Sequence, residues 1–343
     1  MSSAETAKDL VREGLNSRLQ TKIVTEGSIT FPAVPALLDD YTDRIIRVFA
    51  DVGRRFSDDE RAHLRSVLER LLNEAFDRSQ RSTVTISYRS TVAGPLNYNV
   101  NINCMTIEEA YHHWIATRQP PLFGVEPDAR VWALAGESDP AGCRILDIGA
   151  GTGRNALALA RRGHPVDVVE VTEKFAEIIR QAAAQESLDV RVFQRNVFEF
   201  DGDLRNDYSL ILLSEVVSEF RTVGELRQLF ELAARRLAPG GRLVFNIFIT
   251  RDFYTPDDTA RQFAQQAYSG FSTPDEVASA VAGLPLELEA DDCVVEYEKA
   301  HLPQHAWPPT SWYVGWTTGH DVFGLRHEDS PIDMRWLVYR KTV

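Results

Sequence analysis

The sequence contains little cysteine. Its 343 residues include only Cys104, Cys143 and Cys293. They are far apart and form no Cys-x-x-Cys pair, so their spacing indicates neither a disulfide framework nor a cysteine zinc site. A histidine site at His301 and His305 is also disfavoured, because no third ligand is evident. We expect no metal, and this cysteine usage fits a reducing cytoplasm.

Long apolar runs are also missing. No segment approaches the ~20 consecutive apolar residues that a helix needs to cross a bilayer. The amino-terminal twenty residues are polar and charged and have no apolar stretch like that of a signal peptide. We therefore expect no membrane partner.

Positive charge is scarce relative to negative charge. There are 37 Lys and Arg against 50 Asp and Glu, a formal net charge of −13. A surface with that average sign repels phosphate backbones. Nucleic acid is thus not an expected partner, and neutral or cationic small molecules are favoured.

The composition is otherwise that of a folded globular protein, with 44% apolar and 25% charged residues. The length suits one large domain and an added lobe. A turn-rich stretch at 136–142 separates two hydrophobic patterns. We place the boundary there, with an α+β lobe at 1–135 and a second domain at 136–343.

The lobe carries two capping boxes and one hairpin pattern. Ser57 and Glu60 predict a helix that runs to about residue 76, and Thr106 and Glu109 predict one that runs to about 118. Between them, polar and apolar residues alternate over 84–88 and 98–102, which predicts two strands joined through 92–95.

Beyond the boundary, short apolar runs alternate with helical patterns, which is typical of a parallel sheet covered by helices. The expected strands are 144–148, 166–171, 190–193, 209–213, 242–249, 293–297 and 334–339. The expected helices are 155–162, 174–185, 223–237 and one that follows 272–274.

The most informative segment joins the first of these strands to the first helix through Gly149, Gly151 and Gly153. Glycines there let a ligand approach the backbone, and the helix start presents free N–H groups to it. The dinucleotide fingerprint GxGxxG needs Gly or Ala where this chain has Arg154. That difference weighs against a nicotinamide enzyme.

Polar residues follow the successive strands: Asp147, Glu170, Asn196, and then Ser214 with Glu215. With the Gly-Gly turn that leads into the fifth strand, this arrangement resembles the class I S-adenosylmethionine-dependent methyltransferases over about 142–249. The resemblance implies an α/β, Rossmann-like sheet of seven strands whose last strand, 334–339, is reversed. It also implies S-adenosyl-L-methionine as the cofactor.

The resemblance further implies which residues meet the cofactor. Asp147 and the glycine loop would line its methionine and ribose part, and Glu170 would take both ribose hydroxyls. Val171 would pack on the adenine, and Asn196 would meet the adenine edge through its carbonyl oxygen. The full set is Asp147, Gly149, Ala150, Gly151, Gly153, Glu170, Val171, Asn196, Val197 and Ser214.

Methyl transfer from a sulfonium is a direct displacement, so holding the acceptor in line in a dry pocket supplies most of the catalysis. A base matters only if the acceptor carries a proton. The candidate bases are Glu215 and Glu219 after the fourth strand, and His305. The alternative for both glutamates is a solvated loop.

Aromatic residues supply the candidates for the acceptor pocket. They concentrate in the Pro-rich stretch 301–320 and in the helix that ends near Arg118, which could pair with the cofactor carboxylate. The substrate-binding candidates are Tyr111, Trp114, Trp307, Trp312, Tyr313, Trp316 and His320. The alternative for 301–320 is a satellite core under a long loop. The lobe is either a lid over the cofactor cleft or a dimer edge formed by the Asn-rich hairpin.

The sequence therefore predicts a cytoplasmic, metal-independent methyltransferase that acts on an O or N atom of a small metabolite. One alternative is a protein or peptide methyltransferase. Another, of a different class, is a non-catalytic module that binds the cofactor and recruits a partner. A homodimer is left open.

Overall fold

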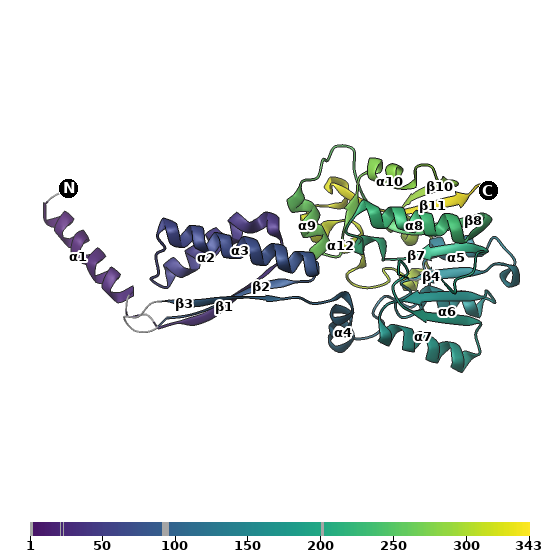
Figure 1. Cartoon of the computed structure of the whole chain (residues 1–343), viewed down its shortest axis with the longest axis horizontal. Coiled ribbons are helices and arrows are strands. Elements are labelled where there is room, and N and C mark those ends of the chain that lie inside the picture. Colours follow the sequence, from purple (N-terminus) through teal and green to yellow (C-terminus); the bar gives the residue numbers. More distant parts are fainter. Residues whose placement is uncertain (1–2, 21, 23, 91–95, 200–201) are drawn as a thin grey trace. The chain divides into compact units, whose positions relative to one another are not determined.

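The computed structural model describes residues 3–20, 22, 24–90, 96–199 and 202–343. They form two compact units that divide between Ala110 and Tyr111 (Figure 1). This division comes earlier than the predicted boundary at 135/136. The reason is that the segment after Tyr111 is bonded into the second unit: the Ala129 N–H donates to Glu298, 2.7 Å away.

The first unit contains a three-stranded antiparallel sheet in the order β1-β2-β3. Its strands are β1 (Glu26–Pro32), β2 (Thr83–Arg89) and β3 (Asn97–Asn103), and its helices are α1 (Ser3–Gln20), η1 (Pro35–Leu37), α2 (Leu38–Asp51) and α3 (Asp58–Arg78). The predicted hairpin is confirmed, with Ile86 opposite Val100. Its connection at 92–95 lies outside the described residues.

Both predicted capping boxes are present. The Ser57 side chain accepts from the Glu60 N–H at the start of α3. Thr106 and Glu109 exchange the equivalent bonds, 2.8 and 3.1 Å long, at the start of α4 (Ile107–Thr117). The sequence patterns did not predict β1, which pairs with β2 along its whole length.

The second unit is built on a sheet in the order β10-β11-β8-β7-β4-β5-β6, with β9 paired to β8. The strands are β4 (Ile145–Ile148), β5 (Val166–Glu170), β6 (Val190–Gln194), β7 (Tyr208–Leu213), β8 (Leu237–Thr250), β9 (Phe271–Ser272), β10 (Leu286–Cys293) and β11 (Ile332–Lys341). Neighbours from β6 to β8 are parallel, whereas β11 is antiparallel to β8. The expected Rossmann-like sheet with a reversed last strand is confirmed.

Helices cover both faces of this sheet. They are α5 (Ala129–Ala135), η2 (Pro140–Gly142), α6 (Arg154–Arg161), α7 (Glu173–Glu186), η3 (Val217–Glu219), α8 (Val223–Arg236), α9 (Asp258–Gln266), α10 (Pro274–Val281), α11 (Val294–His301), η4 (Gln304–Ala306), α12 (Tyr313–Thr317), α13 (His320–Phe323) and η5 (His327–Asp329). Successive strand residues point to opposite faces, so Ile145 joins a core with α5, α6 and α7, while Leu146 joins a core with α8 and α10.

One predicted strand is wrong. Residues 293–297 were expected to be extended, but β10 ends at Cys293 and α11 begins at Val294. Val294 and Glu298 are both buried and lie four residues apart, on the same face of α11. These residues are therefore buried by a helix and not by the expected strand. Among the described residues, no helix combines the length and apolar character that crossing a membrane requires.

Candidate functional site

The glycine loop between β4 and α6 has a backbone that only glycine adopts easily. Gly149 and Gly151 have φ of 71° and 54°. A Cβ on Gly149 would lie 2.5 Å from Val216 Cγ2, and a Cβ on Gly151 would lie 3.2 Å from the Phe123 ring. The loop therefore brings bare backbone to the carboxyl edge of the sheet, where ligands bind in open α/β folds.

Glu170 ends β5 beside this loop and is 4% exposed. Its two carboxylate oxygens accept 2.8 Å hydrogen bonds from the N–H groups of Gly151 and Thr172. Burial raises the pKa of Glu170, while the N–H donors of Thr172 and Gly151 favour its ionised form. The carboxylate is thus held against the loop at the position expected for a ribose-binding acid.

Asp147, in β4, is 1% exposed, and its Oδ2 atom has no hydrogen-bond partner among the described residues. Burial, and then the neighbouring carboxylates of Asp128 and Glu170, raise the pKa of Asp147 to about 8. A buried oxygen without a partner is costly unless something supplies a donor. The loop backbone, Glu170 and this oxygen fit a ligand that carries a ribose diol and an ammonium group.

The remaining predicted cofactor residues lie near the same edge. Val171 follows Glu170 and is 46% exposed, whereas Val197 is buried. The side-chain carbonyl oxygen of Asn196, which was expected to meet an adenine, accepts a hydrogen bond from the Phe198 N–H, 3.0 Å away. Ser214 donates from its hydroxyl to Asp128 over 2.6 Å. Their roles toward a cofactor stay predictions.

A buried ionic network underlies the loop. The Arg154 guanidinium, 6% exposed, donates to Asp128 Oδ1 over 2.6 Å and to Glu215 Oε1 over 3.2 Å. Asp128 Oδ2 also accepts from the Asn155 amide and the Ser214 hydroxyl. No sequence pattern pointed to Asp128, and Arg154 stood out only as a break in the dinucleotide fingerprint.

Glu298 of α11 is another buried carboxylate, and it interacts with the charge of Asp128 in this network. It accepts from the N–H groups of Ala129 and Arg130 at the start of α5, and from the Trp336 indole 3.0 Å away. Burial, followed by the charge of Asp128, raises the pKa of Glu298 to about 7. Glu298 thereby connects α5, α11 and β11.

Glu215 follows β7 with a φ of 62°, which is uncommon for a residue with a side chain. Its N–H donates to Asn246 over 2.7 Å, and its side chain is 12% exposed. Burial raises the pKa of Glu215 to about 7; Arg154 opposes this shift and Asp128 adds to it. A carboxyl group in this range can take up a proton near neutral pH.

Glu215 borders a cavity of about 210 Å³, which we call the aromatic pocket. It is lined by Tyr111, Trp114, Arg118, Phe123, Glu215, Ser218, Glu219, Ala267, Tyr268, Trp312, Trp316 and Asp321. The structure brings together most of the predicted acceptor-side residues and adds Phe123, Tyr268 and Asp321. Phe123 forms a wall of this pocket beside the glycine loop, since a Cβ on Gly151 would lie 3.2 Å from its ring.

Four candidates do not line the aromatic pocket. The His305 side chain is 79% exposed and lies 3.8 Å from Glu126, and the exposed His320 ring bonds the Leu325 carbonyl. Tyr313 is 1% exposed and Trp307 packs edge-on against it, with centroids 5.8 Å apart. The stretch 301–320 folds into short helices, which bury Tyr313 in the core and leave both histidines exposed, so the roles expected for these four residues stay predictions.

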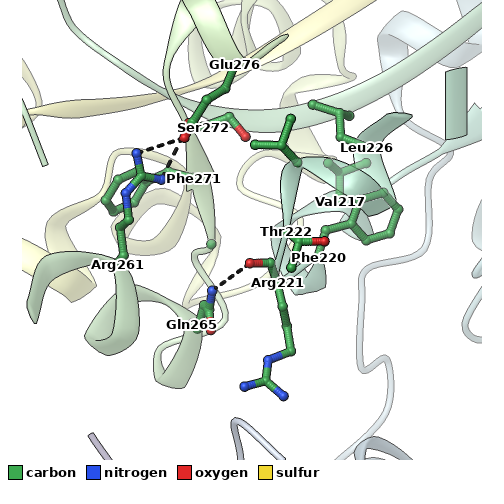
Figure 2. A pocket seen from close by; sticks show the side chains of 12 residues that line it. Val217, Phe220, Arg221, Thr222, Leu226, Arg261, Gln265, Phe271, Ser272 and Glu276 are labelled. Atoms are coloured by element: carbon green, nitrogen blue, oxygen red, sulfur yellow. Dashed lines mark hydrogen bonds and ion pairs between the residues drawn. The ribbon is translucent and has the colours of Figure 1, made fainter. Parts of the chain in front are cut away.

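A second cavity, of about 300 Å³, lies between η3 and the α9–α10 region (Figure 2). Arg261 pairs there with Glu276 at 3.0 Å, and the Gln265 amide donates to the Arg221 carbonyl. Gly270 bonds to the Ser218 carbonyl at its edge. None of the predicted site residues lines this cavity, and we assign it no role.

Cys293, His327 and Asp333 place their potential ligand atoms within 4.8 Å of one another. Spacing along the chain could not indicate this group, because β10, η5 and β11 bring it together only in the fold. Asp333 already pairs with His327 at 2.9 Å and with Arg335 at 3.3 Å. With a guanidinium beside that carboxylate, we assign no cation to the group.

The strand order, the glycine loop and the acid at the end of β5 define a class I methyltransferase fold. Consistent with this, residues 145–241 match the family described as "Methyltransferase domain". Residues 145–241 are therefore similar to a methyltransferase domain, and the Rossmann-like fold that the resemblance in the sequence implied is present in the structure.

Individual relatives are similar over the same region. A protein of Geobacillus sp. (strain WCH70) named as a methyltransferase is 30% identical over 31% of this chain and 43% of its own length. The ubiquinone biosynthesis O-methyltransferase of Xanthomonas oryzae pv. oryzae (strain PXO99A) is 25% identical over 36% of this chain and 51% of its own length. The chain thus spans about half or less of these curated relatives.

Among solved structures, geranyl diphosphate C-methyltransferase from Streptomyces coelicolor A3(2) is 17% identical and has a TM-score of 0.48. The similarity covers 62% of this chain and 80% of that one.

Proposed function

We propose that this protein is an S-adenosylmethionine-dependent methyltransferase that methylates an O or N atom of a small molecule. One observation carries the proposal: Phe123 lies beside the glycine loop, where a Cβ on Gly151 would come within 3.2 Å of its ring, and it also lines the aromatic pocket. A cofactor held at the loop and an acceptor held in the pocket would then be neighbours, as direct transfer requires.

The residues of the loop suit the cofactor. Glu170 would hold the ribose hydroxyls, and Asp147 and Gly149 would hold the part nearer the sulfonium. When bound, the cofactor supplies an activated methyl group. The aromatic side chains exclude water and orient the acceptor, and Glu215 is placed to take a proton from it.

The cavity volume of about 210 Å³ favours a small acceptor over a protein side chain presented in a long groove. The net charge of −13 argues against nucleic acid as substrate. We place the reaction in the cytoplasm. A dimer through the edge strand β3 stays a proposal that a measured mass in solution would test.

Replacing Glu170 with alanine is expected to weaken binding of S-adenosylhomocysteine roughly tenfold to a hundredfold. The reason is that a hydrogen bond to a charged group contributes about 1.5–3 kcal/mol. Isothermal titration calorimetry on the purified protein measures this directly.

Glu177→Ala is the matched control, since Glu177 is an exposed carboxylate on the adjacent helix α7. It should leave the affinity unchanged. Equal affinities for wild type and Glu170→Ala would remove the ribose assignment. Cofactor binding without methyl transfer to any fraction of a metabolite extract would favour a non-catalytic binding module.

A further inference from the structure

The aromatic pocket is organised around Trp114. Its ring stacks on Phe123 with centroids 6.1 Å apart and contacts Tyr268 at 5.9 Å and Trp312 at 6.2 Å. Trp312 in turn meets Trp316 edge-on at 5.6 Å. Side chains from α4, α12 and the connections between elements thus surround one small space with ring faces and edges. Such a space suits either a flat ring or a compact cation.

The charges around this space distinguish between a flat ring and a compact cation as its ligand. Glu215, Glu219 and Asp321 contribute three carboxylates, and Arg118 is the one basic side chain among the described residues that line the pocket. The Arg118 guanidinium already lies over the Trp114 ring, 3.6 Å from its centroid. The pocket therefore has more acidic than basic side chains. The position of Arg118 over Trp114 is an example, within the pocket, of a cation over an aromatic face.

The Glu215 side chain is only 12% exposed, whereas Asp321 is an exposed residue. The Arg154 guanidinium lies 3.2 Å from Glu215 Oε1, which is farther than its 2.6 Å distance to Asp128. A cationic group that entered the pocket would meet a carboxylate in a low-dielectric setting, where the attraction is stronger than in water.

We infer that the acceptor is an amine that enters the aromatic pocket as an ammonium ion, held by the aromatic faces and by Glu215. This inference rests on the proposed function and narrows its acceptor. The ammonium N–H gives its proton to the Glu215 carboxylate, which leaves a lone pair on nitrogen. That lone pair forms the new N–C bond as the methyl C–S bond breaks, and the sulfur leaves as a neutral thioether with the bonding electrons.

A pair of probes with the same shape tests recognition of the cation apart from catalysis. Choline carries a trimethylammonium group, and 3,3-dimethyl-1-butanol replaces its charged nitrogen with carbon. With the protein saturated with S-adenosylhomocysteine, calorimetry should show choline binding about threefold to thirtyfold more tightly, the range expected of a cation on aromatic faces.

Trp312→Leu and Glu215→Gln should each reduce this preference for choline. Trp132→Leu should not, because Trp132 lies on α5 under Arg162 and outside the pocket. Equal binding of the two probes, tighter binding of the neutral one, or binding of neither would overturn the inference. Affinity for S-adenosylhomocysteine, measured on the same samples, separates that result from a failure of the proposed function.

Discussion

Replacing Arg154 with methionine is expected to lower the free energy of unfolding of the second unit by about 3–5 kcal/mol, the range for removing one partner of a buried ion pair. The guanidinium is 6% exposed, and its partners Asp128 and Glu215 are 2% and 12% exposed. Methionine fills a similar volume, so the main effect is that two buried carboxylates lose the positive charge that compensates them. Asp128 would keep its bonds from Asn155 and Ser214.

Arg161→Met on the same helix is the matched control. Arg161 also forms an ion pair, with Glu186 at 2.6 Å, but the two side chains are 51% and 40% exposed. Its removal should cost less than about 1 kcal/mol. All six tryptophans lie in the second unit, so urea unfolding followed by tryptophan fluorescence reports on that unit. Similar losses for the two variants would contradict a stabilising role for the buried network.

Local patterns were sufficient to predict the centre of the fold. The strand β4, the loop with Gly149 and the start of α6 follow one another within a few residues, and each leaves its own signal in the sequence. The acid Glu170 ends the next strand, so its position relative to the loop follows from parallel pairing of β4 and β5. These predictions succeeded because the information is short-range.

The parts of the site that sequence reasoning missed depend on contacts between distant segments. Glu298 bonds Ala129 across 169 positions in the chain, and the Ser214 hydroxyl reaches Asp128 across 86. No periodicity links such pairs. The same long-range bonds explain why residues after Tyr111 belong to the second unit, although the turn-rich stretch at 136–142 suggested a later boundary.

The stretch 301–320 shows the limit of composition as a guide. Its density of Trp and His suggested a pocket wall, and Trp312 and Trp316 do line the aromatic pocket. Tyr313, between them in the sequence, points into the core instead, because consecutive residues of a short helix face different directions. The composition therefore identified the segment, but the geometry of the helix determines which of its side chains line the pocket.

Replacing Glu215 with glutamine is expected to reduce kcat by about 10²–10⁴-fold, the usual contribution of a general base. Glutamine preserves the shape and the contact with Arg154 but cannot accept a proton. Glu219→Gln, at the neighbouring pocket position, should cost less than about tenfold if Glu215 is the base. A larger loss in Glu219→Gln than in Glu215→Gln would assign the proton to the other carboxylate.

The pH dependence supplies an independent readout. Burial raises the pKa of Glu215 to about 7, with Arg154 opposing and Asp128 adding to the shift, while Arg118, Glu219 and Asp321 line the same pocket. A base works only when deprotonated, so kcat/KM should fall as pH decreases through an apparent pKa at or below about 7, because a bound sulfonium favours the carboxylate. That acid limb should be absent in Glu215→Gln. If the limb persists unchanged in the variant, the titrating group is not Glu215 and the proton leaves by another route.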